Sequence, residues 1–247
     1  MHWQKQKNWL ENFSMAGKKI GLFFGSFNPI HNGHLMIANY LAEFGELDQV
    51  WFVISPLNPF KADQDLLPDY HRREMLTRAI GDYPRFRVSS VEFRLPKPSY
   101  TIDTLTFLEK EYPENQFILI MGSDQLPDFH KWKNSEQILA NYKILVYPRP
   151  DSAPNHLTSN LLTPNLLTPN LLTPNLLTPN PLTSDPLTSI RSPLTSLIGH
   201  PSITLVNAPM MEISSSFIRQ AIKDGKDVRF FMPELTWQYL DEMHFYL

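Results

Sequence analysis

The chain has 247 residues and a formal net charge of −3, from 22 basic and 25 acidic side chains. This length can bury one sizeable core, and the nearly balanced charge, without a basic stripe, argues against a nucleic-acid partner. The chain has no cysteine, which excludes disulfides, thiolate metal sites and a cysteine nucleophile and suits a cytoplasmic protein. Its longest apolar runs fall far short of the ~20 residues that cross a bilayer, so no membrane partner is expected.

Residues 1–17 precede the first apolar run and are predicted to be a poorly ordered N-terminal extension. They include basic residues but lack the continuous apolar region of a secretory signal. An amphipathic membrane anchor using Trp3, Trp9, Leu10 and Phe13 is the alternative. One or two helical turns bury too little apolar area for firm membrane binding, so the extension is the preferred interpretation.

Apolar, β-rich runs then alternate with helical patterns up to residue 150. The runs span 19–24, 49–55, 86–91, 116–121 and 143–147, and the helical patterns span 33–44, 69–80, 101–111 and 134–140. In the first helical pattern, Ile37, Leu41 and Phe44 fall on one face. Alternating strands and helices imply βαβ units, and continuous apolar strands are typical of a parallel sheet buried on both faces.

A leucine–threonine pair recurs every five residues from Leu157 to Ser189. A period of five fits neither helix nor strand, and the prolines of the repeat remove backbone donors and favour extended geometry. We therefore predict that 151–198 is a low-complexity, disordered insertion in a surface loop, because lengthening such a loop costs little closure entropy. Two alternatives stay open: a pentapeptide-repeat β-helix, which would be too short to bury a core, and a partner-binding segment.

The α/β pattern resumes after the repeats. Residues 202–206 predict a strand, Phe217–Ile222 a helix, and 233–243 a terminal helix with Pro233 in its first turn. Without 151–198 the chain is one continuous α/β sequence. We therefore predict a single domain, 18–247, with a Rossmann-like, doubly wound, mainly parallel sheet and one low-complexity loop insertion.

The segment 25–34 carries the clearest functional signal. It is Gly-Ser-Phe-Asn-Pro-Ile-His-Asn-Gly-His, and it joins the first predicted strand to the first predicted helix. Such a turn presents backbone N–H groups and a helix N-terminus to an anion. His31 and His34, beside Gly25 and Gly33, add imidazole donors, which indicates phosphate chemistry.

With two departures, this segment resembles the pattern Gly-Gly-Thr/Ser-Phe-Asp-Pro-x-His-x-Gly-His of the nucleotidyltransferase superfamily that includes the class I aminoacyl-tRNA synthetases. Within it, the chain resembles the bacterial nicotinate-nucleotide adenylyltransferases over about 19–150 and 199–247. Phe24 replaces the first glycine and Asn28 replaces the aspartate. Neither change removes a phosphate-binding group, since Gly25 still permits close approach and asparagine also turns the chain. The resemblance implies an ATP-binding role for Gly25, Ser26, Phe27 and Gly33 and a catalytic role for His31 and His34.

Two further positions follow predicted strands. Lys61 lies in a loop stiffened by two prolines; the resemblance implies a contact with substrate phosphates, whereas a solvated surface lysine is the simpler alternative. Gly122 and Asp124 end the strand 116–121, at the edge where open α/β sheets bind ligands. Asp124 is predicted to accept hydrogen bonds from ribose hydroxyls or base amino groups of ATP.

The segment Ser99-Tyr100-Thr101 opens a predicted helix, and Ser99 or Thr101 could serve only as a helix cap. The resemblance implies that this segment borders a pyridine site, with Thr101 close to a nicotinate carboxylate. It also implies that Trp132 stacks on the nicotinate ring, whereas surface packing is the alternative.

The second diagnostic motif is Ile213-Ser-Ser-Ser-Phe-Ile-Arg219. A plain serine cap is the structural alternative. The resemblance implies that Ser214, Ser215, Ser216 and Arg219 grip the β- and γ-phosphates of ATP, combining helix N–H groups, hydroxyls and a guanidinium.

The resemblance implies adenylyl transfer from ATP to nicotinate mononucleotide, giving deamido-NAD and pyrophosphate in NAD biosynthesis. We expect His31, His34, Lys61 and Arg219 to act by positioning and charge neutralisation. Mg²⁺ is expected to be held mainly by substrate phosphates rather than by a protein carboxylate cage. A sister transferase acting on phosphopantetheine or a cytidylyl substrate, and a binding module acting through the repeats, remain alternatives. The oligomeric state is left open.

Overall fold

The computed structural model describes residues 17–56, 66–149, 197 and 199–247. The described residues include neither Lys61 nor the N-terminal extension before Gly17. Of the predicted insertion 151–198, they include only Leu197. No helix within the described ranges is both long and apolar enough to span a bilayer.

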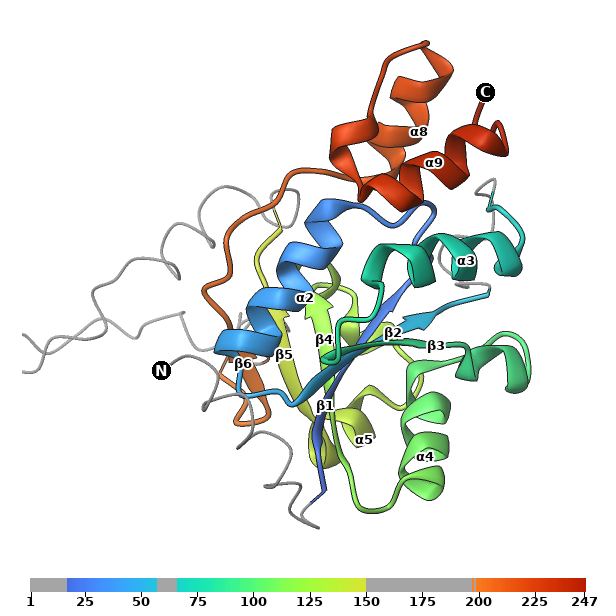
Figure 1. Ribbon diagram of the computed structural model, residues 1–247. Helices are drawn as coiled ribbons and strands as arrows, with labels where there is room; N and C mark the ends of the chain where they lie inside the picture. The colour runs from blue at the N-terminus through green and yellow to red at the C-terminus, as the bar shows by residue number, and fades with distance from the viewer. Residues whose placement is uncertain (1–16, 57–65, 150–196, 198) are drawn as a thin grey trace, which may run out of the picture.

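One sheet of parallel strands forms the centre of the molecule, in the order β3-β2-β1-β4-β5-β6 (Figure 1). The strands are β1 (Lys19–Gly25), β2 (Gln49–Ile54), β3 (Phe86–Ser89), β4 (Gln116–Gly122), β5 (Lys143–Tyr147) and β6 (Ile203–Leu205). Every neighbouring pair is parallel; Leu22 of β1, for example, lies opposite Trp51 of β2 and Leu119 of β4. The chain order reverses between β1 and β4, so the predicted doubly wound fold is confirmed and the ligand crevice is expected at this switch point.

Helices cover both faces of the sheet, as the alternating pattern predicts. They are α2 (Asn32–Phe44), α3 (Asp69–Ile80), α4 (Thr101–Glu111), α5 (Ser135–Asn141), α8 (Ser215–Lys223) and α9 (Glu234–Glu242). Short 3₁₀ helices are η2 (Val91–Arg94), η3 (Ser123–Gln125), η4 (Phe129–Lys131) and η6 (Arg229–Phe231).

Two hydrophobic cores result because successive strand residues point to opposite faces. The first core packs α2, α3, α8 and α9 on the face that carries Phe23 of β1. The second packs α4, α5 and η4 on the face that carries Ile20 and Leu22. In Figure 1, α8 and α9 (orange and red) lie over the end of the sheet where β1 leads into α2. The two faces are therefore closed, and the carboxyl edge is partly covered by the C-terminal helices.

Some element boundaries differ from the prediction. The third strand ends at Ser89 and is followed by η2, and the helix after the serines begins at Ser215 rather than Phe217. Of the three residues assigned to one face of α2, Ile37 and Leu41 are buried, whereas Phe44 is 74% exposed. The buried stripe ends at Ala42, and beyond it Phe44 stacks on Tyr40 one turn earlier, at 5.0 Å between ring centroids.

The repeat-containing segment connects two neighbouring parallel strands. Ile144 of β5 pairs with Ile203 of β6, so the chain must cross from the carboxyl end of β5 to the amino end of β6. Leu197, within this crossover, is buried in the second core. The connection therefore contains at least one residue that contributes to packing.

Candidate active site

The loop after β1 places two histidines at the start of α2. His31 is the N-cap residue of α2 in extended conformation, and its carbonyl accepts a hydrogen bond from the His34 amide at 3.0 Å. The two imidazole rings face each other with 3.7 Å between centroids. Phe27 packs edge-on against the His34 ring at 5.2 Å, and Phe23 does so at 6.1 Å. The motif thus folds into a compact imidazole pair supported by aromatic rings of the first core.

His31 is a neutral imidazole in this environment. Its side chain is buried, and Nδ1 has no hydrogen-bond partner among the described residues. Burial, and secondarily the positive charge of Arg149, lower the pKa of His31 from 6.5 to about 3. A buried polar atom without a partner calls for an explanation, and a bound anion would provide one. The ring can therefore donate an N–H to a phosphate, but it brings no positive charge of its own before the anion binds.

Both glycines of the motif leave room for rings. A Cβ on Gly33 would lie 3.1 Å from ring atoms of His31, and a Cβ on Gly25 would lie 2.9 Å from the Phe27 ring. Phe27 itself adopts φ = 46°, a left-handed conformation that is rare for a bulky side chain. Such a conformation persists only where surrounding contacts fix it, and Phe27 is fully buried. The loop is therefore held in one shape by packing.

The two diagnostic motifs meet, as their resemblance to a single site predicts. Arg219 Nη1 donates to the Asn28 carbonyl at 2.7 Å, and Ser215 Oγ donates to the Pro29 carbonyl at 2.9 Å. Ser214 caps α8, because its Oγ accepts from the Phe217 amide at 3.1 Å. The predicted alternative of a serine cap is confirmed for this residue. The N-terminus of α8 consequently lies against the loop 25–34.

The departure at Asn28 has a structural explanation. This side chain is fully buried, and its Oδ1 accepts hydrogen bonds from the Leu67 amide at 3.2 Å and the Tyr246 hydroxyl at 2.7 Å. A carboxylate oxygen can accept the same two bonds, but it would bring a charge into the buried site. The asparagine therefore keeps the acceptor and avoids that desolvation cost.

Arg149 joins the site, although sequence reasoning did not identify it. It follows β5 at the carboxyl edge and lines one hollow together with both histidines, Gly33 and Ile213. Its Nε lies 3.8 Å from Oδ2 of the predicted Asp124, and its amide donates to Ser123 Oγ at 2.9 Å. The sequence signal was available, since a basic residue two positions beyond the end of a parallel strand lies at the ligand edge.

Gly122 permits this arrangement. It is the last residue of β4, and a Cβ there would lie 2.9 Å from Cδ of Arg149 and would also collide with the Asp124 carboxylate. The ends of β1, β4 and β5 and the start of α8 therefore converge on one polar edge at the topological switch point.

The two predicted pyridine-site segments, 99–101 and the one that carries Trp132, are connected through Lys133. Trp132 packs against Phe129 with 5.3 Å between centroids, and the neighbouring Lys133 lies 4.6 Å over the Tyr100 ring. Lys133 also pairs with Asp103 in the first turn of α4 at 2.9 Å. The structure thus joins the start of α4 to the segment that carries Trp132.

The cap interpretation of this segment was wrong. Tyr100 is the N-cap residue of α4, and no side chain makes a cap hydrogen bond there. Ser99 instead donates to the buried Glu92 carboxylate at 3.0 Å, as does Thr104, and Ser55 bonds to it as well. Burial raises the pKa of Glu92. Through Glu92, Ser99 therefore connects the start of α4 to Ser55 just after β2. Thr101 is the first residue of α4 and does not cap it.

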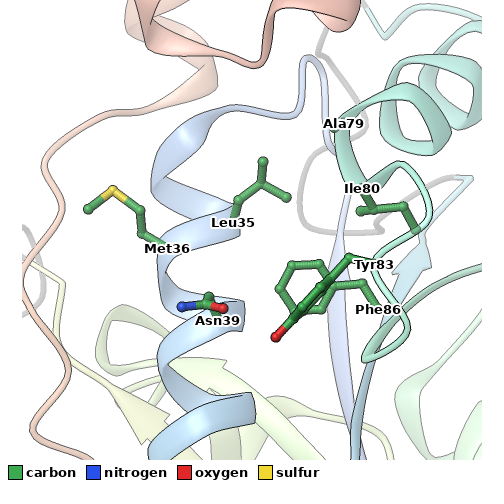
Figure 2. A pocket seen from close by; sticks show the side chains of 7 residues that line it. All are labelled: Leu35, Met36, Asn39, Ala79, Ile80, Tyr83 and Phe86. Atoms are coloured by element: carbon green, nitrogen blue, oxygen red, sulfur yellow. The ribbon is translucent and has the colours of Figure 1, made fainter. Parts of the chain in front are cut away.

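A second hollow lies away from this edge. Figure 2 shows it between α2 and the end of α3, with apolar side chains around Asn39 and Tyr83. It contains none of the predicted site residues. The convergence of histidines, arginines and helix N-termini makes the carboxyl edge, rather than this hollow, the candidate active site.

Within the described residues there is no group of three or more His, Cys, Asp or Glu side chains placed to hold a metal ion.

The chain matches the family described as Cytidylyltransferase-like over residues 22–221. The chain therefore belongs to the cytidylyltransferase-like family. The solved structure of Plasmodium falciparum nicotinic acid mononucleotide adenylyltransferase complexed with NaAD shares the fold, with a TM-score of 0.65 at 19% identity. That match covers 93% of this chain and 97% of the other.

Within this broad family, two relatives of high sequence identity share the description nicotinate-nucleotide adenylyltransferase. A probable nicotinate-nucleotide adenylyltransferase of Christiangramia forsetii is 42% identical over 229 residues, covering 93% of this chain and 98% of that protein. A protein of the same description from Bacteroides fragilis is 44% identical over 224 residues, covering 91% and 92%. The resemblance to the nicotinate-nucleotide adenylyltransferases is thereby confirmed.

Proposed function

We propose that this chain transfers the adenylyl group of ATP to nicotinate mononucleotide, producing deamido-NAD and pyrophosphate for NAD biosynthesis. The observation that carries the proposal is the junction of the two motifs: Arg219 and Ser215 bond to the backbone of the loop that bears the histidine pair. One helix N-terminus, one guanidinium and two imidazoles thus face the switch point of the sheet, which suits a bound triphosphate.

The chemistry is an in-line displacement at the α-phosphorus of ATP. A phosphate oxygen of the mononucleotide forms the new P–O bond, and pyrophosphate leaves with the electrons of the bond it loses. Because the attacking phosphate is already anionic, no protein nucleophile or strong base is required. Catalysis then consists of holding both substrates and stabilising the charge that develops on the phosphate oxygens.

The proposed roles of the described residues follow from their surroundings, and the role of Lys61 follows from the family resemblance. The neutral His31 donates an N–H to an ATP phosphate and, with His34, supports the α-phosphate. The positive charge comes from Arg219 and Lys61, and we add Arg149 because it lines the same hollow as the histidines. The backbone of the loop and of the α8 start completes the ATP site: Gly25, Ser26, Phe27, Gly33, Ser214, Ser215 and Ser216, with Gly122 and Asp124 for the nucleoside.

The acceptor site lies at the start of α4. Trp132 and Tyr100 offer aromatic faces to the nicotinate ring, while Thr101 and the helix N-terminus at the start of α4 suit its carboxylate. Ser99 anchors this segment through its hydrogen bond to the buried Glu92 carboxylate. Phosphopantetheine, the acceptor in one alternative, has no aromatic ring that could stack on Trp132 or Tyr100.

Mg²⁺ would accompany ATP. Phosphate oxygens and water would hold most of its coordination sites, as is usual for Mg²⁺ bound with a nucleotide. The ion would neutralise phosphate charge, which adds to the work of the arginines.

A pyrophosphate-release assay tests the acceptor. ATP is supplied with nicotinate mononucleotide, nicotinamide mononucleotide or phosphopantetheine, and CTP replaces ATP in a parallel series. We expect turnover with ATP and nicotinate mononucleotide. If folded protein turned over only phosphopantetheine, or used only CTP as the nucleotide donor, the chain would be assigned to the sister transferases instead.

A further inference from the structure

A buried arginine outside the motifs connects the parts of the proposed active site. Arg72, on α3, has no exposed surface. Burying a guanidinium is costly unless its N–H groups are paired, so a completely buried arginine needs partners that repay this cost. Nothing in the local sequence singles out Arg72, because α3 is a polar helix with other arginines.

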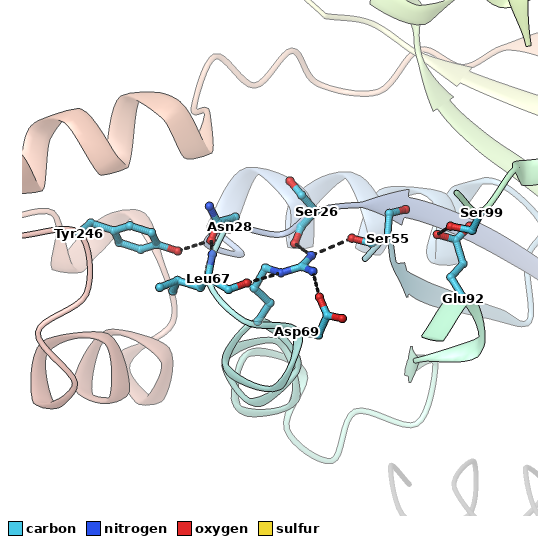
Figure 3. Close-up of polar contacts among 9 residues, drawn as sticks. Ser26, Asn28, Ser55, Leu67, Asp69, Glu92, Ser99 and Tyr246 are labelled. Carbon is cyan, nitrogen blue, oxygen red and sulfur yellow. Dashed lines mark hydrogen bonds and ion pairs between the residues drawn. The ribbon is translucent and has the colours of Figure 1, made fainter. Parts of the chain in front are cut away.

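The partners of Arg72 come from three separate segments, as Figure 3 shows. Nη1 donates to the Ser26 carbonyl at 2.7 Å and to the Ser55 carbonyl at 2.9 Å. Nε donates to the Leu67 carbonyl at 3.0 Å, and Nη2 pairs with Asp69. The planar, rigid fork of arginine fixes these carbonyls relative to one another, which the single ammonium of lysine cannot do.

Each of these carbonyls lies at a point where the site is assembled. Ser26 precedes the strained Phe27 in the loop that leads to the histidines. Ser55 follows β2, and its amide donates to the Gly25 carbonyl at 3.0 Å. The Leu67 amide donates to Asn28 Oδ1, so Leu67 is tied to the same loop from its other side. Ser55 and Leu67 therefore both bond to the loop 25–34. Arg72 bonds to Ser55, to Leu67 and to the loop itself through Ser26.

We propose that Arg72 is a positioning residue of the active site. It does not touch the substrate; it holds the loop 25–34 against the end of β2 and the start of α3, so that the loop amides and the histidines keep the geometry that the triphosphate requires. This inference rests on the proposed function, because the loop is taken to bind ATP. A displacement of about 1 Å in such a site can cost about 100-fold in rate.

The test compares Arg72→Lys with Arg73→Lys, a matched substitution of the exposed neighbour on the same helix. Circular dichroism and the Tm establish that each variant is folded at the assay temperature. The KM for ATP, the KM for nicotinate mononucleotide and kcat are then measured. We expect Arg72→Lys to lower kcat/KM for ATP at least 10-fold, with an increased KM for ATP and a nearly unchanged KM for the mononucleotide, while Arg73→Lys matches the wild type.

The split between the constants separates positioning from stability. A smaller folded fraction would lower the apparent kcat and leave both KM values unchanged. If Arg72→Lys is folded and its KM for ATP stays within twofold of the wild type, the proposal is overturned. If Arg72→Lys does not fold, Asp69→Asn takes its place, since it removes the charge that orients one end of the fork. A threefold or larger increase in the KM for ATP then supports the proposal, and a smaller one overturns it. A wild-type protein without turnover would refute the proposed function separately.

Discussion

At the scale of single residues, the protonation of His31 distinguishes two ways of stabilising a phosphate. A charged imidazolium would attract ATP electrostatically, whereas a neutral ring acts only through the direction of its N–H bond. Burial keeps the pKa of His31 far below 6.5, so the second description holds for the free protein. In the proposed mechanism, the charge that attracts ATP is assigned to Arg219, Arg149 and Lys61.

The lowered pKa of His31 predicts how stability depends on pH. The His31 imidazole takes up a proton near pH 6.5 in the unfolded chain but only near pH 3 in the folded protein. Between these values the unfolded state binds more protons, so the free energy of unfolding decreases as the pH falls. Above about pH 6.5 His31 is neutral in both states and costs no stability. At pH 5 its protonation in the unfolded chain lowers the free energy of unfolding by about 2 kcal/mol. Urea unfolding at pH 7 and pH 5 measures this loss.

His31→Gln is the control, because glutamine does not titrate. The loss between pH 7 and pH 5 should be smaller in this variant by roughly the same 2 kcal/mol. Equal losses in both proteins would show that His31 titrates normally in the folded state.

The sequence allowed His31 and His34 to be predicted as a pair, because a strand, small residues and a helix follow one another locally. It did not allow Arg72 or Glu92 to be predicted as buried groups. Their burial depends on carbonyls and hydroxyls supplied by segments distant in the chain, and neither follows an apolar period. Arg149 falls between these cases, since its place after a strand was visible and its proximity to His31 was not.

At the scale of elements, the C-terminal end of the chain is linked to the loop 25–34. Tyr246 donates to Asn28 Oδ1 although the two residues are 218 positions apart in sequence. Burial raises the pKa of Tyr246, so its hydroxyl remains a donor at all ordinary pH values. The tail thus supports the buried side chain that departs from the family pattern.

Tyr246→Phe tests this link. The substitution removes the hydroxyl that donates to Asn28 Oδ1 and should lower the free energy of unfolding by about 1 kcal/mol. Tyr70→Phe, which changes a 65% exposed tyrosine on α3, should have no comparable effect in the same urea titration. Equal stabilities of the two variants would mean that the hydrogen bond to Asn28 contributes nothing measurable.

The order and type of the regular elements could be predicted because apolar runs and helical patterns are local signals. The contact between the two motifs could not, since Arg219 and Asn28 are 191 positions apart. Only the resemblance to a family with both motifs pointed to their meeting. The exposed Phe44 shows a further limit: periodicity identifies a helix face but not where the core beneath it ends.

At the scale of the whole molecule, the repeats lie in the crossover between β5 and β6. A parallel crossover needs about a dozen or more residues, and Leu197 belongs to the second core. Removing all of 151–198 would therefore disturb packing as well as the repeats. A deletion limited to 157–189 keeps Leu197 and leaves enough chain for the crossover.

We propose that the repeats are a passenger insertion, and the deletion of 157–189 tests this. Closing a shorter loop changes the closure entropy only slightly, so the Tm and kcat/KM should stay close to those of the full chain. A folded deletion variant that has lost adenylyl transfer would show that the repeats take part in function.

In the proposed reaction, the α-phosphorus of ATP is transferred to nicotinate mononucleotide at the histidine pair. This transfer is followed with ATP labelled at the α-phosphate, by separating the products formed by the wild type and by His34→Ala. We predict label in deamido-NAD, an equal amount of pyrophosphate, and a large loss of both in the variant. Label appearing only in AMP, or wild-type turnover by His34→Ala, would contradict the account.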